Sequence, residues 1–301
     1  MKIFISTGFL LLFYLQIFSD PEKLPSEFAY NFDCTSNKSC NLLLNQSEDE
    51  LSTSDGEYKY YGNNLGEFFC EEISASKKLK WKRTLGAGIF VKPLILEDKV
   101  IFGSKDGSLY SLNKNNGVIL WKYNTAGEIM SSASANKEQI VFGSTDGNIY
   151  SITQKHGSKK WLHLANSKIN TNPVVFNDKV FFGDSDGNFY CLNADNGSLL
   201  WKITLSGTIL PHPSVDKNNL YIATSNNLLA IELKSGKQLW KVGLPKLTKA
   251  NVQVTGDSIL LYDFIDSITY YNPYNGRKLG TRFQKGSTNQ KIYNFDGELT
   301  N

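Results

Sequence analysis

Cysteine, methionine and histidine are scarce in this chain of 301 residues, with four, two and three copies. No CxxC motif occurs and the histidines are scattered, so the sequence offers no cluster for a metal ion, and no metal site is predicted. Cys34 and Cys40 lie close together in a polar segment, and in an oxidising compartment they could close a small disulfide loop. Cys70 and Cys191 are interpreted as small buried apolar residues.

An excess of one charge sign is also missing. Lys and Arg total 32 and Asp and Glu total 29, which gives a net charge of +3. Without a clustered basic face, a nucleic-acid partner is not predicted. The densest basic run, KKLKWKR at 77–83, is interpreted as a solvated surface, with an anionic partner as the alternative.

Long hydrophobic runs are absent beyond the N-terminus. Ile3 to Phe18 is apolar apart from three residues, and it is shorter than the roughly 20 residues of a spanning helix. With Lys2 before it, the run predicts a secretory signal over residues 1–19. An uncleaved anchor is the alternative, and no cysteine lies directly after the run to mark a bacterial lipid anchor. We therefore expect an exported protein, periplasmic or extracellular, that meets a membrane only through a partner or an uncleaved N-terminal segment.

Tryptophan is absent everywhere except on one regular spacing. The intervals between successive tryptophans are 40, 40, 40 and 39 residues, and Gly280 stands at the sixth position. The same interval separates three Asp-Gly pairs, at 106–107, 146–147 and 186–187. An internal repeat of this length indicates a repeat architecture. The five tryptophans are Trp81, Trp121, Trp161, Trp201 and Trp240.

One repeat, residues 93–123, reads as four short strands. PLILE, VIFGS, SLYSLN and VILWKY are separated by DK, KDG and KNNG, and Asp-Gly favours a tight hairpin. No segment outside the N-terminus shows a helical period. Four antiparallel strands in about 40 residues make one blade of a β-propeller, so the fold is predicted to be all-β.

Counting repeats predicts six blades. Five are complete, and residues 60–81 supply the last three strands of another. The sequence after Gly280 is predicted to supply its missing first strand, which makes a composite closing blade; seven or eight blades with degenerate ends are the alternative. The predicted domains are a signal peptide (1–19), a polar flexible segment (20–56) and the propeller (57–301).

Each tryptophan is interpreted as a structural docking residue, because a large flat side chain would fill the wedge between neighbouring blades. An aromatic row that binds a ligand would not need one tryptophan per repeat. The aspartates that could be proposed as catalytic are explained by hairpin turns, and no catalytic residue is predicted; these aspartates are Asp106, Asp146, Asp186 and Asp266.

The unit VFFGDSDGNFYCLNADNGSLLWK resembles the repeat of the PQQ-like, or quinoprotein-type, β-propeller family. The matching residues are Gly183, Gly187, Ala194, Gly197 and Trp201, and the resemblance covers about residues 57–300. One branch of this family contains quinone-dependent dehydrogenases with eight blades, a calcium ion and often a disulfide between adjacent cysteines. No two cysteines are adjacent here, so the resemblance implies no quinone cofactor.

The other branch is similar to the propeller subunit of the bacterial outer-membrane β-barrel assembly machine, which is a protein-interaction scaffold. The resemblance to this branch implies a non-catalytic exported scaffold with a protein partner, in envelope or outer-membrane protein assembly. The alternative is a propeller that senses or recognises a ligand. A PQQ-dependent dehydrogenase is the least favoured function.

Overall fold

Residues 51–283, apart from 75–76, 245–250, 256 and 263–266, are described by the structure, a computed structural model. In them, β-strands make six antiparallel sheets of four strands each. The fold is therefore an all-β propeller with six blades, as the sequence predicts. The predicted signal segment (1–19) and the cysteine pair Cys34 and Cys40 lie outside the described residues.

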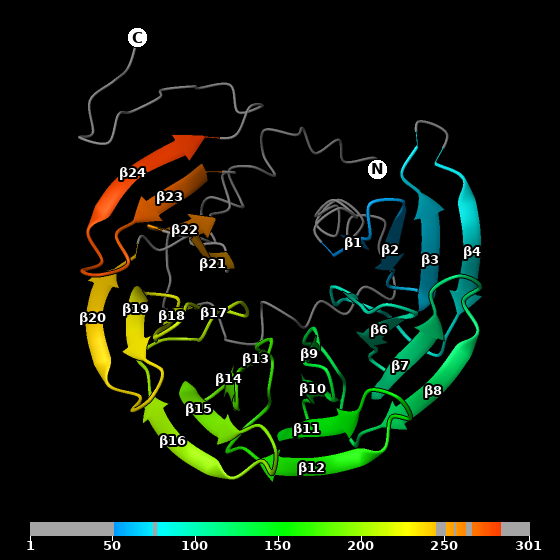
Figure 1. Cartoon of the computed structure of the whole chain (residues 1–301), viewed down its shortest axis with the longest axis horizontal. Helices are drawn as coiled ribbons and strands as arrows, with labels where there is room; N and C mark the ends of the chain where they lie inside the picture. Colours follow the sequence, from blue (N-terminus) through cyan, green and yellow to red (C-terminus); the bar gives the residue numbers. More distant parts are fainter. Residues whose placement is uncertain (1–50, 75–76, 245–250, 256, 263–266, 284–301) are drawn as a thin grey trace, which may run out of the picture. The chain divides into compact units, whose positions relative to one another are not determined.

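The first three blades use consecutive strands of the chain (Figure 1). Blade 1 contains β1 (Thr53–Ser54), β2 (Tyr58–Gly62), β3 (Glu67–Glu72) and β4 (Leu79–Thr84). Blade 2 contains β5 (Leu94–Ile95), β6 (Lys99–Gly103), β7 (Ser108–Asn113) and β8 (Ile119–Asn124). Blade 3 contains β9 (Ser134–Ala135), β10 (Gln139–Gly143), β11 (Asn148–Thr153) and β12 (Lys159–Leu164).

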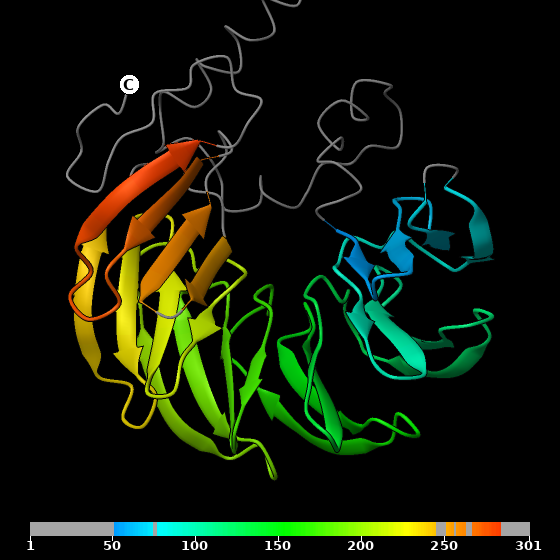
Figure 2. The same ribbon diagram turned by 45° about the horizontal axis from the view of Figure 1, so that its top comes forward.

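The last three blades repeat this order (Figure 2). Blade 4 contains β13 (Val174–Phe176), β14 (Lys179–Gly183), β15 (Asn188–Asn193) and β16 (Leu199–Thr204). Blade 5 contains β17 (Ser214–Val215), β18 (Asn219–Ala223), β19 (Asn227–Glu232) and β20 (Gln238–Gly243). Blade 6 contains β21 (Asn251–Thr255), β22 (Ser258–Tyr262), β23 (Ser267–Tyr271) and β24 (Lys278–Phe283).

The predicted composite closing blade is wrong, because β1 supplies the first strand of blade 1. Thr53 pairs with Tyr60 and Ser54 with Lys59, both from the adjacent β2. The Thr53 hydroxyl also donates a hydrogen bond to the carbonyl of Pro93 in the connection to blade 2, at 2.7 Å. These contacts hold β1 in the sheet, although this strand is too short for its sequence to show an alternation of apolar and polar residues. Among the described residues, the first strand of the propeller is therefore β1, which begins at Thr53, four residues before the predicted boundary at 57.

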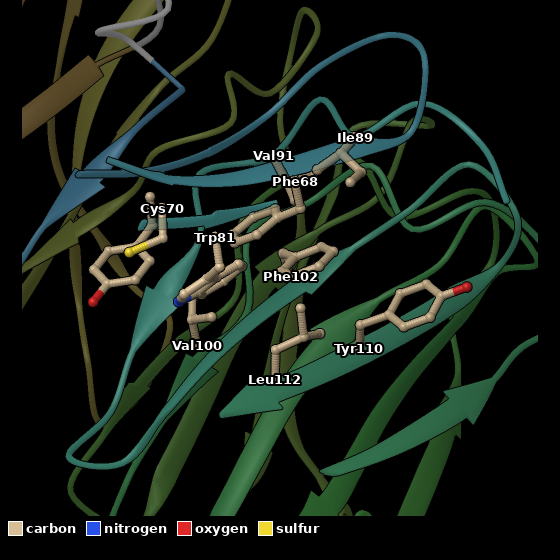
Figure 3. Close-up of a cluster of buried hydrophobic side chains, with 10 residues drawn as sticks. Phe68, Cys70, Trp81, Ile89, Val91, Val100, Phe102, Tyr110 and Leu112 are labelled. Atoms are coloured by element: carbon tan, nitrogen blue, oxygen red, sulfur yellow. The ribbon is translucent and has the colours of Figure 1, made fainter. Parts of the chain in front are cut away.

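Hydrophobic core fills the spaces between blades. Five clusters of buried side chains each join two consecutive blades, and Figure 3 shows the one between blades 1 and 2. There, Phe68 of β3 stacks on Phe102 of β6 with ring centroids 3.8 Å apart. We call the side of a blade that packs against the next blade its forward face, and the opposite side its backward face. Burial of these two faces is what makes each blade depend on its neighbours.

Candidate interaction surface

The tryptophans lie on the fourth strand of blades 1 to 5, on the forward face. Trp81 and Trp161 are buried and the other three are partly exposed. Four of the indole N–H groups donate to a carbonyl in the following blade, so the side chain crosses the interface rather than filling its own sheet. These bonds run from Trp81 to Lys114 (3.0 Å), Trp161 to Ala194 (2.8 Å), Trp201 to Leu233 (3.0 Å) and Trp240 to Pro273 (2.9 Å).

Each indole ring lies on a glycine in the turn between the third and fourth strands of the next blade. At Gly197, an added Cβ would lie 2.6 Å from Cε3 of Trp161, closer than any real contact. The glycine also has a φ of +72°, a conformation that side chains disfavour. The turn therefore needs glycine for two reasons, and the five matched glycines are Gly117, Gly157, Gly197, Gly236 and Gly276.

Trp121 differs from the other four tryptophans. Its Nε1 is buried without a hydrogen-bond partner among the described residues, and so is the Oγ of Ser111. These two residues face each other across β7 and β8. The ring of Trp121 still covers Gly157 in blade 3, at 2.8 Å from the position of an added Cβ. Ring packing is thus common to all five contacts, whereas the hydrogen bond is not.

We predict that Trp161→Ala and Gly197→Ala each destabilise the protein and that their effects are strongly non-additive. Removing the packed indole should cost about 3–5 kcal/mol of unfolding free energy. In Gly197→Ala, the added Cβ methyl group would collide with the indole ring of Trp161, and the side chain would strain the backbone of the turn. In the double variant the methyl group no longer meets a ring, so part of its cost should vanish.

Urea unfolding of the two single variants and the double variant measures this coupling. Gly243→Ala is the matched control, because Gly243 has open space around its Cα and no positive φ. Additive losses from Trp161→Ala and Gly197→Ala would show that the two residues do not form one contact.

A second set of contacts links the blades beside their first strands. The backbone N–H of Lys92 donates to Ser132 Oγ (3.0 Å), and that of Ser132 donates to Asn172 Oδ1 (2.7 Å). Asn172 in turn contacts Nδ1 of His212 at 2.8 Å. These four residues, which we call the polar ladder, are 40 positions apart and lie in four consecutive repeats. Sequence reasoning missed them because each repeat uses a different side chain.

The polar ladder requires a neutral imidazole at His212. Since Asn172 Oδ1 accepts from Ser132, its Nδ2 must be the donor to His212 Nδ1, which therefore accepts. Burial, with a contribution from the positive charge of Lys92, lowers the pKa of His212 below its ordinary value of 6.5. Protonation would remove the acceptor and break this link between blades 4 and 5.

We predict that the protein loses stability as the pH falls from 6.5 through the lowered pKa of His212. Below 6.5 the unfolded chain binds a proton that the folded chain resists, so the free energy of unfolding decreases. His212→Gln removes this titration and should flatten that part of the pH profile of stability. His163 also has a pKa lowered by burial, so part of the slope should remain.

Urea titrations at several pH values between about 5 and 8 measure the slope. The control is His156→Gln, because His156 lies exposed in a turn of blade 3. An unchanged slope in His212→Gln would contradict the assigned role of this ring.

Two of the four aspartates considered as catalytic candidates shape hairpin turns through their side chains. Asp146 Oδ1 accepts from the backbone N–H of Asn148 at 2.9 Å, and its Oδ2 accepts from the hydroxyl of Tyr150 at 2.7 Å. Asp106 makes the same two contacts in blade 2. In blade 4 the buried Asp184, not Asp186, holds the tyrosine, and Asp266 lies outside the described residues.

The fourth strands of blades 1 to 5 expose large apolar side chains, with one leucine each on blades 1 and 5 (Leu79 and Leu239) and a larger set on blades 2, 3 and 4. Each fourth strand is the edge of its sheet, and a bulge places one extra residue just before the tryptophan position. In blades 2, 4 and 5 this residue is a leucine, and in blades 2 and 4 the residue before it is also apolar, so two consecutive apolar residues reach solvent. We call the set on blades 2 to 4 the apolar rim: Val118, Ile119, Leu120, Leu162, Leu164, Leu199 and Leu200, with exposed fractions from 44 to 69%.

A groove of about 600 Å³ lies between blades 4 and 5, and the charged side chains of Asp178, Lys179, Lys217 and Glu232 contribute to its lining. Ligand pockets are usually lined by apolar side chains with a few polar groups. Within the described ranges, no three His, Cys, Asp or Glu side chains come together to hold a metal ion. The same part of the chain contains no helix long and apolar enough to cross a membrane.

Comparison with known proteins shows the family to which this propeller belongs. The model of the family described as outer membrane protein assembly factor BamB matches residues 49–241 and 146–293. The chain belongs to this family. No curated protein matches the sequence.

Solved structures with the same fold include BamB from Moraxella catarrhalis. It is 19% identical over 81% of each chain, with a TM-score of 0.66. The computationally designed protein Ika8 is 14% identical over 77% of this chain and 73% of its own (TM-score 0.69). Sqt1 of Saccharomyces cerevisiae is 14% identical over 76% and 71% (TM-score 0.68). At these identities the structural matches show the fold alone, and the family match supplies the link to BamB.

Proposed function

We propose that this protein is an exported, non-catalytic scaffold that binds a protein partner during the assembly of outer-membrane proteins. Its membership of the BamB family supports this role, because the family is described as an assembly factor. The observation that carries the proposal is the apolar rim. It places exposed leucine and isoleucine side chains on three consecutive blades, in strands whose outer edge pairs with no other described strand.

An apolar surface of this kind is typical of a protein-binding site. The bulge in each fourth strand disturbs the edge, which protects it from unspecific strand pairing. Recognition would then depend on side chains, chiefly Leu120 and Leu200 at the bulges. Lysine occupies the same bulge position in blades 1 and 3, as Lys80 and Lys160. The fold therefore accepts either residue type, and the leucines are available for binding rather than needed for folding.

The proposed location is the periplasm. Its support is the apolar run from Ile3 to Phe18 after Lys2, which has the pattern of an export signal. In that compartment, Cys34 and Cys40 are proposed to form a disulfide. The charged groove between blades 4 and 5 lends little support to a ligand sensor, and two of the candidate aspartates accept hydrogen bonds in turns.

The double variant Leu120→Lys, Leu200→Lys tests the rim. We predict that it loses its protein partners, because the added ammonium groups must be desolvated on binding. Its stability should stay within about 0.5 kcal/mol of the wild type, as is usual for exposed positions. The measurement is the amount of outer-membrane assembly proteins that co-purify with the tagged protein from the source envelope.

Gln238→Lys is the matched control, since Gln238 occupies on blade 5 the position that Leu199 has on blade 4. The control should keep its partners. If the double variant retains them as well, the rim is not the contact surface. If neither the wild type nor the variants recover an assembly protein, the proposed function itself is wrong.

A further inference from the structure

Two buried polar atoms lie without a hydrogen-bond partner in the interface between blades 2 and 3. Among the described residues, Ser111 Oγ and Trp121 Nε1 are the buried side-chain atoms in this condition. Ser111 is fully buried, and it lies directly opposite Trp121 in the pairing of β7 with β8. A buried donor without a partner is costly, and such groups are usually satisfied by a bound water or ion. The pair therefore marks a candidate binding site inside the protein.

The next interface, between blades 3 and 4, shows how the same positions are satisfied there. The hydroxyl of Ser151 donates to Oε1 of Gln139 at 2.6 Å, and Nε2 of Gln139 donates to the carbonyl of Ala194 at 2.8 Å. Trp161 Nε1 donates to the same carbonyl, also at 2.8 Å. One glutamine amide thus joins the serine and the indole through a shared backbone acceptor in the following blade.

Blade 2 keeps the serine and the tryptophan of this arrangement, but Lys99 stands in place of Gln139. The side chain of Lys99 is largely buried, and its ammonium group pairs with Asp98 at 3.4 Å. An ammonium group only donates hydrogen bonds, so it cannot accept the serine proton as the glutamine oxygen does. Lys99 therefore leaves Ser111 and Trp121 to another partner.

The backbone turn that supplies the acceptor is repeated in blade 3. Gln154 occupies there the position that Ala194 has in blade 4. The N–H of Gln154 donates to the carbonyl of Glu138 at 3.1 Å, and the N–H of Ala194 donates to that of Asp178 at 2.8 Å. Because the two turns follow the same course, we expect the carbonyl of Gln154 to face the interface as that of Ala194 does.

We propose that one water molecule is bound between blades 2 and 3, where it bridges Ser111 Oγ and Trp121 Nε1. The water accepts hydrogen bonds from the indole N–H and the serine hydroxyl, and it donates to the carbonyl of Gln154. Three polar partners are the usual number for a buried water. The water takes the role that the Gln139 amide has in the next interface, so one interface is bridged by solvent and the other by a side chain.

A small anion is a poorer occupant of this site. Lys99 lies on the same face of the sheet as Ser111, but its charge is already balanced by Asp98. A buried anion without a counter-charge is costly, whereas water is neutral and can also donate to the Gln154 carbonyl. The inference concerns the interior of one chain, so it does not depend on the proposed scaffold function.

A crystal structure of the full chain, at a resolution that shows ordered water, tests the inference. We expect density for one water within hydrogen-bond distance of Ser111 Oγ and Trp121 Nε1. No such density is expected between Ser151 and Trp161, where the amide of Gln139 stands. A structure in which both orphan atoms bond to protein groups would overturn the inference. So would density at the site that is replaced by bromide when crystals are soaked in this ion, because that indicates an anion.

Urea unfolding of Ser111→Ala tests the same site in solution. The fold accepts alanine here, since Ala230 has this position in blade 5. If the hydroxyl is bonded to water, its removal should raise the equilibrium constant of unfolding about two- to tenfold, the usual net effect of one hydrogen bond. Ser151→Ala is the matched control and should show a similar rise, because that hydroxyl is bonded to Gln139. An unchanged or lower constant in Ser111→Ala alone would show a hydroxyl without a partner and contradict the bound water.

Discussion

The contact between an indole ring and a glycine turn is the interaction on which the rest of this propeller depends. It occurs five times, always from the fourth strand of one blade to the turn of the next. Four of the five rings also donate a hydrogen bond to the neighbouring blade. Because a blade of about 40 residues cannot bury both of its faces alone, this repeated contact fixes how neighbouring sheets meet.

The same contact explains where the repeat ends. Its two halves are a tryptophan and a glycine, and the two terminal blades each lack one half. Blade 6 has Gly280 in place of the tryptophan, and blade 1 has Lys77 in place of the glycine. The Lys59–Glu71 pair adds charge on the same side of blade 1. The ends are thus chemically different from the five internal interfaces.

Much of the fold could be predicted from the sequence because packing acts on every repeat in the same way. The tryptophan spacing and the Asp-Gly hairpins predict four-stranded blades and their number. The first strand of blade 1 could not be predicted, since Thr53 and Ser54 are held by backbone pairing and by one bond to Pro93. The polar ladder could not be predicted, because its contacts recur at the same position of each repeat while the residue type at that position changes from one repeat to the next. The exchange of Asp184 for Asp186 was missed because two turn positions that are two residues apart can each reach the tyrosine hydroxyl.

The most direct test of the central contact is the exchange of the indole N–H protons, followed by NMR on tryptophan-labelled protein. The account predicts strongly slowed exchange for Trp81, Trp161, Trp201 and Trp240, whose N–H groups are bonded across an interface. Exchange of all five indoles at the rate of a free indole would place these rings in water and contradict the account.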